Sequence, residues 1–275
     1  MVLFLLCVMH SRVIAIVGFL AMAPNTLPAQ KDSVSHALRE GVSARTWIVP
    51  AALGISVAFD QEARECALGS HTRSLDRLAK LVNPLGTAGR LVPGMAIVYV
   101  GAVITNHESL AMGTLNTAAG YVAADLVESV LKPIVGRERP HVEGNSRRFR
   151  PFTTDGDWHS FPSAHVSHIA SIVEAVSQQT SSTPISAIGD LLVALVGWDR
   201  VYEDQHWTSD VVATVALSSI VSGATVRWLE SHWSHSDDAA GAGSRCTPCG
   251  DSNVPLNQAV ILQQYQYQST RPVHP

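Results

Sequence analysis

Two neighbouring apolar stretches decide the fold class: LVPGMAIVYVGAVIT, residues Leu91–Thr105, and LAMGTLNTAAGYVAADLVESVL, residues Leu110–Leu131. Each is longer than the roughly 4 to 8 residues of an ordinary strand, and neither alternates apolar with polar residues as a half-buried strand does. The two stretches therefore predict two apolar helices joined by a short polar connection.

The rest of the chain extends the same pattern on both sides. Further helices are expected over residues 46–59, 61–80, 163–178, 185–201 and 209–231. The helix over 61–80 carries mixed charges, which suit a solvated, amphipathic element. Because few alternating β-branched runs occur, the sequence predicts an all-α bundle of about six helices.

Charge is scarce in this chain. Hydrophobic residues make up 46% of its 275 residues and charged residues 15%, whereas about 25% of a typical soluble domain is charged. This composition excludes an intrinsically disordered chain, which needs low hydrophobicity and high net charge. The 19 Lys and Arg residues against 23 Asp and Glu give a net charge of −4, which argues against a nucleic-acid partner.

The N-terminal segment has the composition of a targeting sequence. Residues 13–30 are uncharged, follow Arg12 and contain small-residue cleavage sites, so residues 1–29 predict a signal peptide, with Met9 a candidate for the true start. An uncleaved membrane anchor is the alternative. Either interpretation exports the protein to the periplasm or cell envelope.

The remaining chain divides into a helical domain over 33–235, with its motifs within 90–230, and a low-complexity tail over 236–275 that we expect to be disordered. The uncharged runs of the domain are 14 to 17 residues long, and a membrane-spanning helix needs about 20. We therefore expect a membrane-associated or integral bundle, with the number of spans left open.

Three blocks of polar residues interrupt the apolar pattern. The first, Lys132–Pro140 (KPIVGRERP), opens a stretch rich in Pro and Gly that reaches Phe161 and predicts a long functional loop. Residues 132–150 hold six basic and two acidic side chains, a local charge of +4. Phosphate suits such a cluster, because Arg offers paired donors and Lys a point charge. A solvated or membrane-surface basic loop is the alternative.

The second block is Phe161–His165 (FPSAH), in which Ser163 is a candidate N-cap. The N–H groups at the start of a helix attract anions, and His165 in the first turn is a candidate acid or base. In the third block, Arg200–Asp210 (RVYEDQHWTSD), His206 and Asp210 are four residues apart. On a helix they share a face, so the Asp210 carboxylate is expected to bond the His206 ring and orient a nucleophile. An ordinary capped helix and a helix-stabilising pair are the alternatives.

Together the blocks read Lys-x6-Arg-Pro, Pro-Ser-x-His and Arg-x5-His-x3-Asp. In this order they resemble the three signature motifs of the type 2 phosphatidic acid phosphatase and vanadium haloperoxidase superfamily. The resemblance covers roughly residues 90–230. It implies an all-helical bundle with the site at one end.

The resemblance also implies a role for each motif residue. Lys132, Arg139 and Arg200 hold the phosphate oxygens, assisted by Ser163 and the amide of Ala164. His206 is the nucleophile that forms a phosphohistidine, and Asp210 orients it. His165 protonates the leaving oxygen and then activates water. No metal or other cofactor is needed, because the cationic side chains neutralise the charge that develops in phosphoryl transfer.

Two positions depart from the family pattern. Ala164 stands where Gly is common, and Asp199 stands where Ser is common before the Arg. Alanine keeps the backbone N–H that an anion needs. The Asp199 carboxylate is expected to compete with phosphate for the Arg200 guanidinium and to tune activity.

The sequence thus predicts a metal-independent acid phosphatase or phosphatidate phosphatase-like hydrolase, acting on a lipid phosphate, an isoprenyl diphosphate or a small phosphate ester. The alternatives are a haloperoxidase that holds vanadate at His206 and a non-catalytic phosphate- or lipid-binding membrane protein. A zinc site that includes His168 lacks the usual ligand spacing, and Cys246 and Cys249 are candidates for a local disulfide or no function. Trp158, His159 and Trp207 are candidates for lining the leaving-group pocket or for packing against neighbouring helices.

Overall fold

The computed structural model describes residues 51–180 and 182–242, and their side chains as far as residue 231. The expected signal peptide over 1–29 and both candidate disulfide cysteines lie outside the described residues. The tail expected over 236–275 also lies outside them, except that the last helix reaches Ala242.

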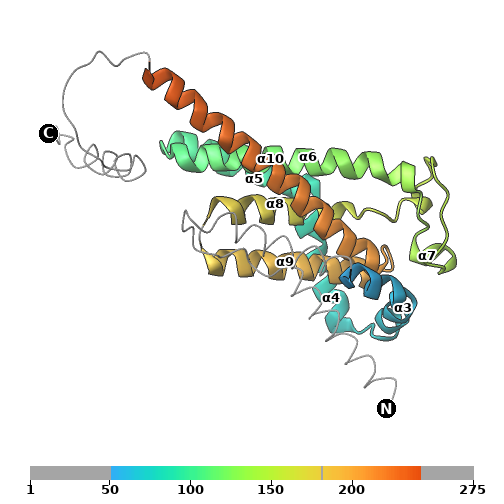
Figure 1. Ribbon diagram of the computed structural model, residues 1–275. Helices are drawn as coiled ribbons and strands as arrows, with labels where there is room; N and C mark the ends of the chain where they lie inside the picture. The colour runs from blue at the N-terminus through green and yellow to red at the C-terminus, as the bar shows by residue number, and fades with distance from the viewer. Residues whose placement is uncertain (1–50, 181, 243–275) are drawn as a thin grey trace. The chain divides into compact units, whose positions relative to one another are not determined.

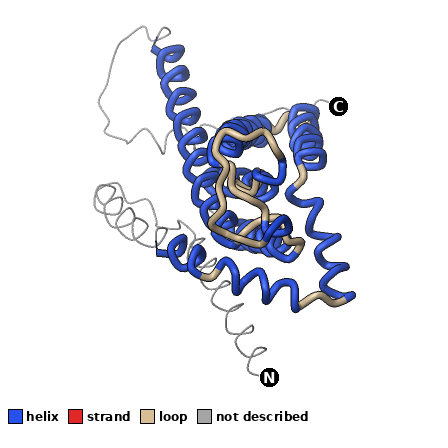
Figure 2. Tube along the Cα trace, turned by 90° about the vertical axis from the view of Figure 1, so that its right-hand side faces the viewer, coloured by secondary structure: helices blue, strands red, loops and turns tan. Residues whose placement is uncertain are grey.

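Within the described residues the chain is helical, which confirms the all-α fold class (Figures 1 and 2). Residues 51–58 are helical, and the elements that follow are α3 (Asp60–Gly69), α4 (Arg73–Val82), η1 (Asn83–Gly86), α5 (Ala88–Ile104), α6 (Glu108–Val135), α7 (Pro140–Glu143), η2 (Gly156–Trp158), α8 (Ala164–Gln179), α9 (Thr183–Tyr202) and α10 (Thr208–Ala242). One isolated antiparallel bridge joins Arg137 to Phe149 within the loop after α6.

The single helix expected over 61–80 is wrong, since the structure has two helices there. The chain breaks after Gly69, and Thr72 adopts an extended conformation before α4. The Thr72 hydroxyl accepts a hydrogen bond from the Leu75 amide at 3.3 Å, which is the bonding of a helix N-cap. This local cap competes with continuation of the helix.

Helix α6 runs further than expected, to Val135, and ends at Gly136. Gly136 has φ of 57°, and a Cβ added there would lie 1.9 Å from the Arg150 carbonyl oxygen. Only glycine fits such a left-handed cap with the backbone so close. The Arg150 amide donates to the Gly136 carbonyl at 2.6 Å, which ties the loop to the end of α6.

Helix α8 lies between α6 and α9, and α5 packs against α6. Around α8, six buried apolar side chains form the hydrophobic core: Val82, Val166, Ile169, Ala170, Val193 and Val196.

A second contact of α8, with α10, is made by small polar residues. Ser218 donates to Ser167 Oγ at 2.9 Å, and Ser222 donates to the Ser171 carbonyl at 2.7 Å.

The small side chains bring helix backbones close together, as is common where helices pack within membranes. Gly120 of α6 completes the contact, because a Cβ there would lie 2.4 Å from Ser222 Oγ. The contacts between α8 and α10 continue to the residue before α8, where the Ser163 amide donates to Thr214 Oγ1 at 2.9 Å. The start of α8 is therefore held beside the first turns of α10, and these two helix starts carry the second and third motifs.

Large apolar side chains are exposed on α5, α6 and α9, among them Ile97, Ile104, Leu126, Ile188 and Leu191. Within the described residues, Thr208–Ser231 is long and apolar enough to cross a membrane. The pair Arg73–Gly86 and Ala88–Ile104, bent by 55°, passes the same test as one broken span. Apolar patches of this kind mark contact with a partner or a membrane.

Candidate active site

The predicted site residues come from the ends of five helices. Lys132 lies in the last turn of α6, and Arg139 directly precedes α7. Ser163 directly precedes α8, whose first turn holds Ala164 and His165, and Arg200 lies in the last turn of α9. His206 lies in the turn before α10, and Asp210 lies in the first turn of that helix.

The three predicted phosphate-binding cations converge on both predicted histidines. Burial lowers the pKa of His165, and the positive charges of Arg200, His168, Lys132 and Arg139 add to the effect, which brings the pKa to about 4. Burial also lowers the pKa of His206 well below its usual value, with Arg139, Lys132 and Arg200 adding to the effect and the hydrogen bond to Ser160 opposing it. Both rings are therefore neutral at pH 7 in the protein alone.

The hydrogen bonding of His206 determines which ring nitrogen is free. Its Nδ1 lies 2.5 Å from the Ser160 backbone oxygen. A carbonyl can only accept, so Nδ1 carries the proton and Nε2 keeps its lone pair. His206 is 4% exposed, so this tautomer is fixed in a buried site.

The expected direct bond from Asp210 to the His206 ring is wrong. Asp210 Oδ2 accepts from Ser160 Oγ at 2.6 Å and from the Trp207 amide at 3.0 Å instead. A bond across four residues requires both residues on one helix, but α10 begins at Thr208 and His206 precedes it. Ser160 makes the connection, because its carbonyl holds His206 and its hydroxyl holds Asp210.

Two of the three cations have a carboxylate partner from the chain itself. Lys132 forms an ion pair with Glu128, one turn earlier on α6. Arg200 Nε donates to Asp199 Oδ2 at 2.9 Å, and Arg200 Nη2 donates to the same oxygen. The contact anticipated from the Asp199 departure is thus present in the structure.

The third cation, Arg139, bonds neutral oxygens. Its Nε donates to the Gly156 carbonyl at 3.0 Å, and its Nη1 donates to the Gln205 side-chain oxygen at 3.0 Å and to the Gln205 carbonyl at 3.3 Å. These bonds fix the position of the guanidinium without neutralising its charge.

Ser163 is fully buried, and its hydroxyl has no hydrogen-bond partner among the described residues. The residue stands at the N-cap position of α8, as expected, but its side chain makes no capping bond. A buried hydroxyl without a partner is unusual in a folded protein. Next to the open amides of the first turn of α8, it can donate to an anion.

The three candidates for pocket lining have other contacts. Trp207 is 1% exposed and its Nε1 donates to the Glu138 carbonyl at 2.9 Å, so packing is its role and the lining interpretation is wrong. Trp158 lies under the Arg148 guanidinium at 5.3 Å. His159 Nε2 lies 2.9 Å from the Thr153 carbonyl oxygen.

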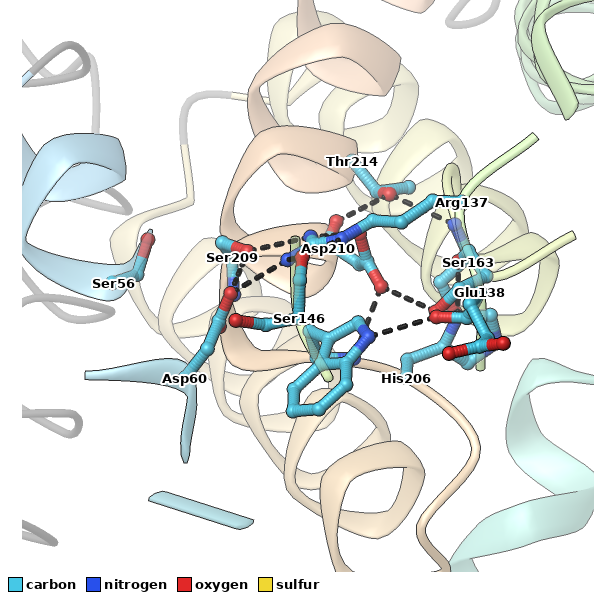
Figure 3. A network of polar contacts seen from close by, with 12 residues as sticks. Ser56, Asp60, Arg137, Glu138, Ser146, Ser163, His206, Ser209, Asp210 and Thr214 are labelled. Carbon is cyan, nitrogen blue, oxygen red and sulfur yellow. Dashed lines mark hydrogen bonds and ion pairs between the residues drawn. The ribbon is translucent and has the colours of Figure 1, made fainter. Parts of the chain in front are cut away.

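Sequence reasoning missed a buried ionic network centred on Arg137 (Figure 3). Arg137 Nη1 donates to Asp210 Oδ1 at 2.6 Å and to Ser209 Oγ at 2.7 Å, and Nη2 donates to Asp60 Oδ2 at 2.7 Å. Both Nε and Nη2 also donate to the Ser146 carbonyl.

Asp60, from α3, holds the start of α10 in this network. Its Oδ1 accepts from the Ser209 amide at 2.9 Å, and its Oδ2 accepts from the Ser209 hydroxyl at 2.6 Å. The sequence placed Arg137 in an anion-binding cluster, whereas the structure uses it to join α3, the loop after α6 and α10. Within residues 51–180 and 182–231, no three His, Cys, Asp or Glu side chains are grouped as metal ligands.

Comparison with known proteins supports the motif analysis. Residues 113–234 match the PAP2 superfamily. The transmembrane PAP2 type phosphatidylglycerolphosphate phosphatase from Bacillus subtilis is similar in structure, with a TM-score of 0.53 at 19% identity, over 67% of this chain and 94% of that one. Aquifex aeolicus LpxE gives a TM-score of 0.47 at 20% identity, over 62% of this chain and 95% of that one. No curated protein matches the sequence.

Proposed function

We propose, from the match of residues 113–234 to the PAP2 superfamily, that this chain is a metal-independent phosphatase that works through a phosphohistidine. The same match confirms the family resemblance that the three motifs indicate. The observation that carries the proposal is the convergence of Lys132, Arg139 and Arg200 on two neutral histidines. Three cations can neutralise the charge of a transferring phosphoryl group, which is most of what such a site has to do.

In the first step, His206 Nε2 attacks phosphorus and the bond from phosphorus to the ester oxygen breaks. The leaving oxygen takes a proton from His165. In the second step, His165 takes a proton from water, the resulting hydroxide attacks phosphorus, and the bond to His206 breaks. Inorganic phosphate leaves, and both rings return to their starting states.

His165 must be protonated to act as the acid, although its pKa is about 4 in the protein alone. The cations Arg200, Lys132 and Arg139 contribute to that low value. A bound phosphate dianion offsets their charge and so raises the pKa of His165 in the complex. We therefore infer that substrate binding and protonation of His165 occur together.

We propose a phosphorylated lipid as the substrate class, with an isoprenyl diphosphate or small phosphate ester also accommodated by the same chemistry. The exposed apolar side chains of α5, α6 and α9 support association with a membrane. The Bacillus subtilis protein of similar structure is a transmembrane phosphatidylglycerolphosphate phosphatase. We place the enzyme in the cell envelope, after export.

The test is phosphate release by the full chain in detergent with a chelator present, using a lipid phosphate, an isoprenyl diphosphate and an aryl phosphate. His206→Ala should reduce turnover by about 10³-fold or more, as loss of a covalent nucleophile does. His107→Ala is the matched control, because His107 is exposed and makes no capping bond. Equal turnover in His206→Ala and wild type would overturn the mechanism.

A second measurement looks for the intermediate itself. His165→Ala retains the nucleophile but slows attack by water. With the aryl phosphate, whose leaving oxygen needs little protonation, the first step is slowed less than the second, so a phosphorylated protein should accumulate after rapid quenching. The phosphoryl group on the protein should be stable in alkali and lost in acid, as expected for a phosphohistidine. Phosphate binding without any turnover, across all three substrates, would favour the non-catalytic alternative.

A further inference from the structure

The Asp199 carboxylate is the most unusual group at the site. It is completely buried, and its Oδ1 has no hydrogen-bond partner among the described residues. Its Oδ2 accepts from both Nε and Nη2 of Arg200. Burial raises the pKa of Asp199 and the neighbouring Arg200 opposes that rise, so the guanidinium is the main group that keeps this carboxylate charged.

The edge of Arg200 that Asp199 occupies is the edge that a phosphate would use. Nε and one terminal nitrogen form the fork with which arginine binds carboxylate and phosphate oxygens. The two anions therefore compete for the same donors. Asp199 is the residue next to Arg200 in the chain, so it stays near the guanidinium even when a ligand displaces it.

The charges around the site show what this competition does. Lys132, Arg139 and Arg200 supply three positive charges, while Glu128 and Asp199 contribute two negative charges to the same group. The protein alone thus presents one net positive charge from these five groups. Three uncompensated cations would bind both substrate and inorganic phosphate, the product, more tightly without raising the rate of the chemical step.

We propose that Asp199 is a positioning residue that competes with phosphate for Arg200 and thereby weakens the binding of substrate and product. This inference rests on the proposed phosphatase function. Phosphate binding displaces the carboxylate from the Nε and Nη2 edge, and release of product restores the ion pair. Uniform weakening of this kind raises KM and the inhibition constant for phosphate without lowering the rate of the chemical step.

The test is Asp199→Asn, which keeps the shape of the side chain and an oxygen for Arg200 but removes the charge. The inhibition constant for inorganic phosphate and the KM should each fall by about tenfold, and kcat should stay equal or fall. Phosphate should also raise the melting temperature of Asp199→Asn more than that of wild type, since tighter binding stabilises the folded state more.

Asp204→Asn is the matched control. Asp204 pairs with Arg64 through two hydrogen bonds of 2.6 and 2.8 Å, outside the cation group. Its φ is 55°, a conformation that Asn tolerates well. This variant loses a carboxylate–guanidinium pair of the same kind, and its phosphate inhibition constant should equal that of wild type.

The outcomes separate the inference from the proposed function. If wild type neither releases nor binds phosphate, the proposed function fails. If wild type does both, and a folded Asp199→Asn binds phosphate equally or more weakly, Asp199 only positions Arg200 and the inference is overturned. Asp199→Ser, which introduces the residue common in the resembling family, provides the same comparison if the Asn variant does not fold.

Discussion

Arg137 and Arg200 are buried to the same degree, at 7% and 6% exposure, yet their surroundings differ. Arg137 bonds two carboxylates, a hydroxyl and a carbonyl, which come from α3, α10 and the loop after α6. Arg200 is bonded by the carboxylate of its own neighbour, Asp199. Burial alone therefore does not distinguish the two arginines, whereas the number of separate elements that their bonds connect does, and we propose that this number separates a scaffold arginine from a ligand-binding one.

The largest effect is expected for Arg137→Met. Removing one partner of a buried ionic network leaves Asp60 and Asp210 as uncompensated buried charges, which costs about 3–5 kcal/mol of unfolding free energy. Denaturant unfolding of the full chain in detergent measures this loss. If Arg137→Met and Arg200→Met lose the same stability, the distinction between a scaffold arginine and a ligand arginine is wrong.

Arg200→Met tests the other side of the comparison. Losing one group that stabilises transition-state charge lowers turnover by about 10²–10³-fold. The stability loss should be smaller than for Arg137→Met, because Arg200→Met leaves one carboxylate without a partner and not two. Phosphate-release kinetics on the soluble aryl ester, with unfolding measured in parallel, give both quantities. Wild-type turnover in this variant would remove Arg200 from the site.

Ser160→Ala tests whether the two regions are coupled. The hydroxyl donates to Asp210 in the Arg137 network, while the carbonyl of the same residue holds His206. Alanine keeps the carbonyl and removes the hydroxyl, so we expect a stability loss of about 1.5–3 kcal/mol, typical of a hydrogen bond to a charged group. If turnover of the folded fraction is unchanged, the network supports the fold without orienting the nucleophile.

The fold class and most helices could be predicted because apolar runs report local structure. The helix expected over 163–178 is found as Ala164–Gln179, and that expected over 185–201 lies within Thr183–Tyr202. The break between α3 and α4 was missed because the Thr72 cap is formed by one hydrogen bond within a mixed polar sequence. Local caps compete closely with helix continuation.

The site was less predictable than its motifs suggest. The motif spacing identified His206 and Asp210, but not that Ser160, 46 residues before His206, lies between them. Asp60 is 77 residues from Arg137 and carries no motif signal, so only the folded chain brings them together. In contrast, the Asp199–Arg200 contact could be anticipated because the two residues are adjacent in sequence.

A smaller effect is expected for Glu128→Gln. Lys132 keeps 18% of its side chain exposed, so solvent screens its pairing with Glu128 more than it screens the pairing of Arg200 with Asp199. Removing the Glu128 charge should lower the phosphate inhibition constant by about two- to threefold, less than Asp199→Asn. A larger effect at Glu128 than at Asp199 would reverse the ranking of the two carboxylates.

The smallest expected effect is the pH dependence that His165 gives to phosphate binding. It distinguishes the site from the Arg137 network, which takes no part in that binding. The pKa of His165 is about 4 in the protein alone and rises when a phosphate anion binds beside it. Between the pKa of about 4 and the higher pKa of the complex, the complex holds more protons than the protein alone. Binding must therefore strengthen as the pH falls through this window, and the contribution of His165 must level off below about 4.

Phosphate itself also titrates, so the informative quantity is the difference in protons taken up on phosphate binding between wild type and His165→Gln. Calorimetry in buffers of different ionisation enthalpy should show more proton uptake by wild type than by His165→Gln. Equal uptake would mean that His165 does not face the phosphate.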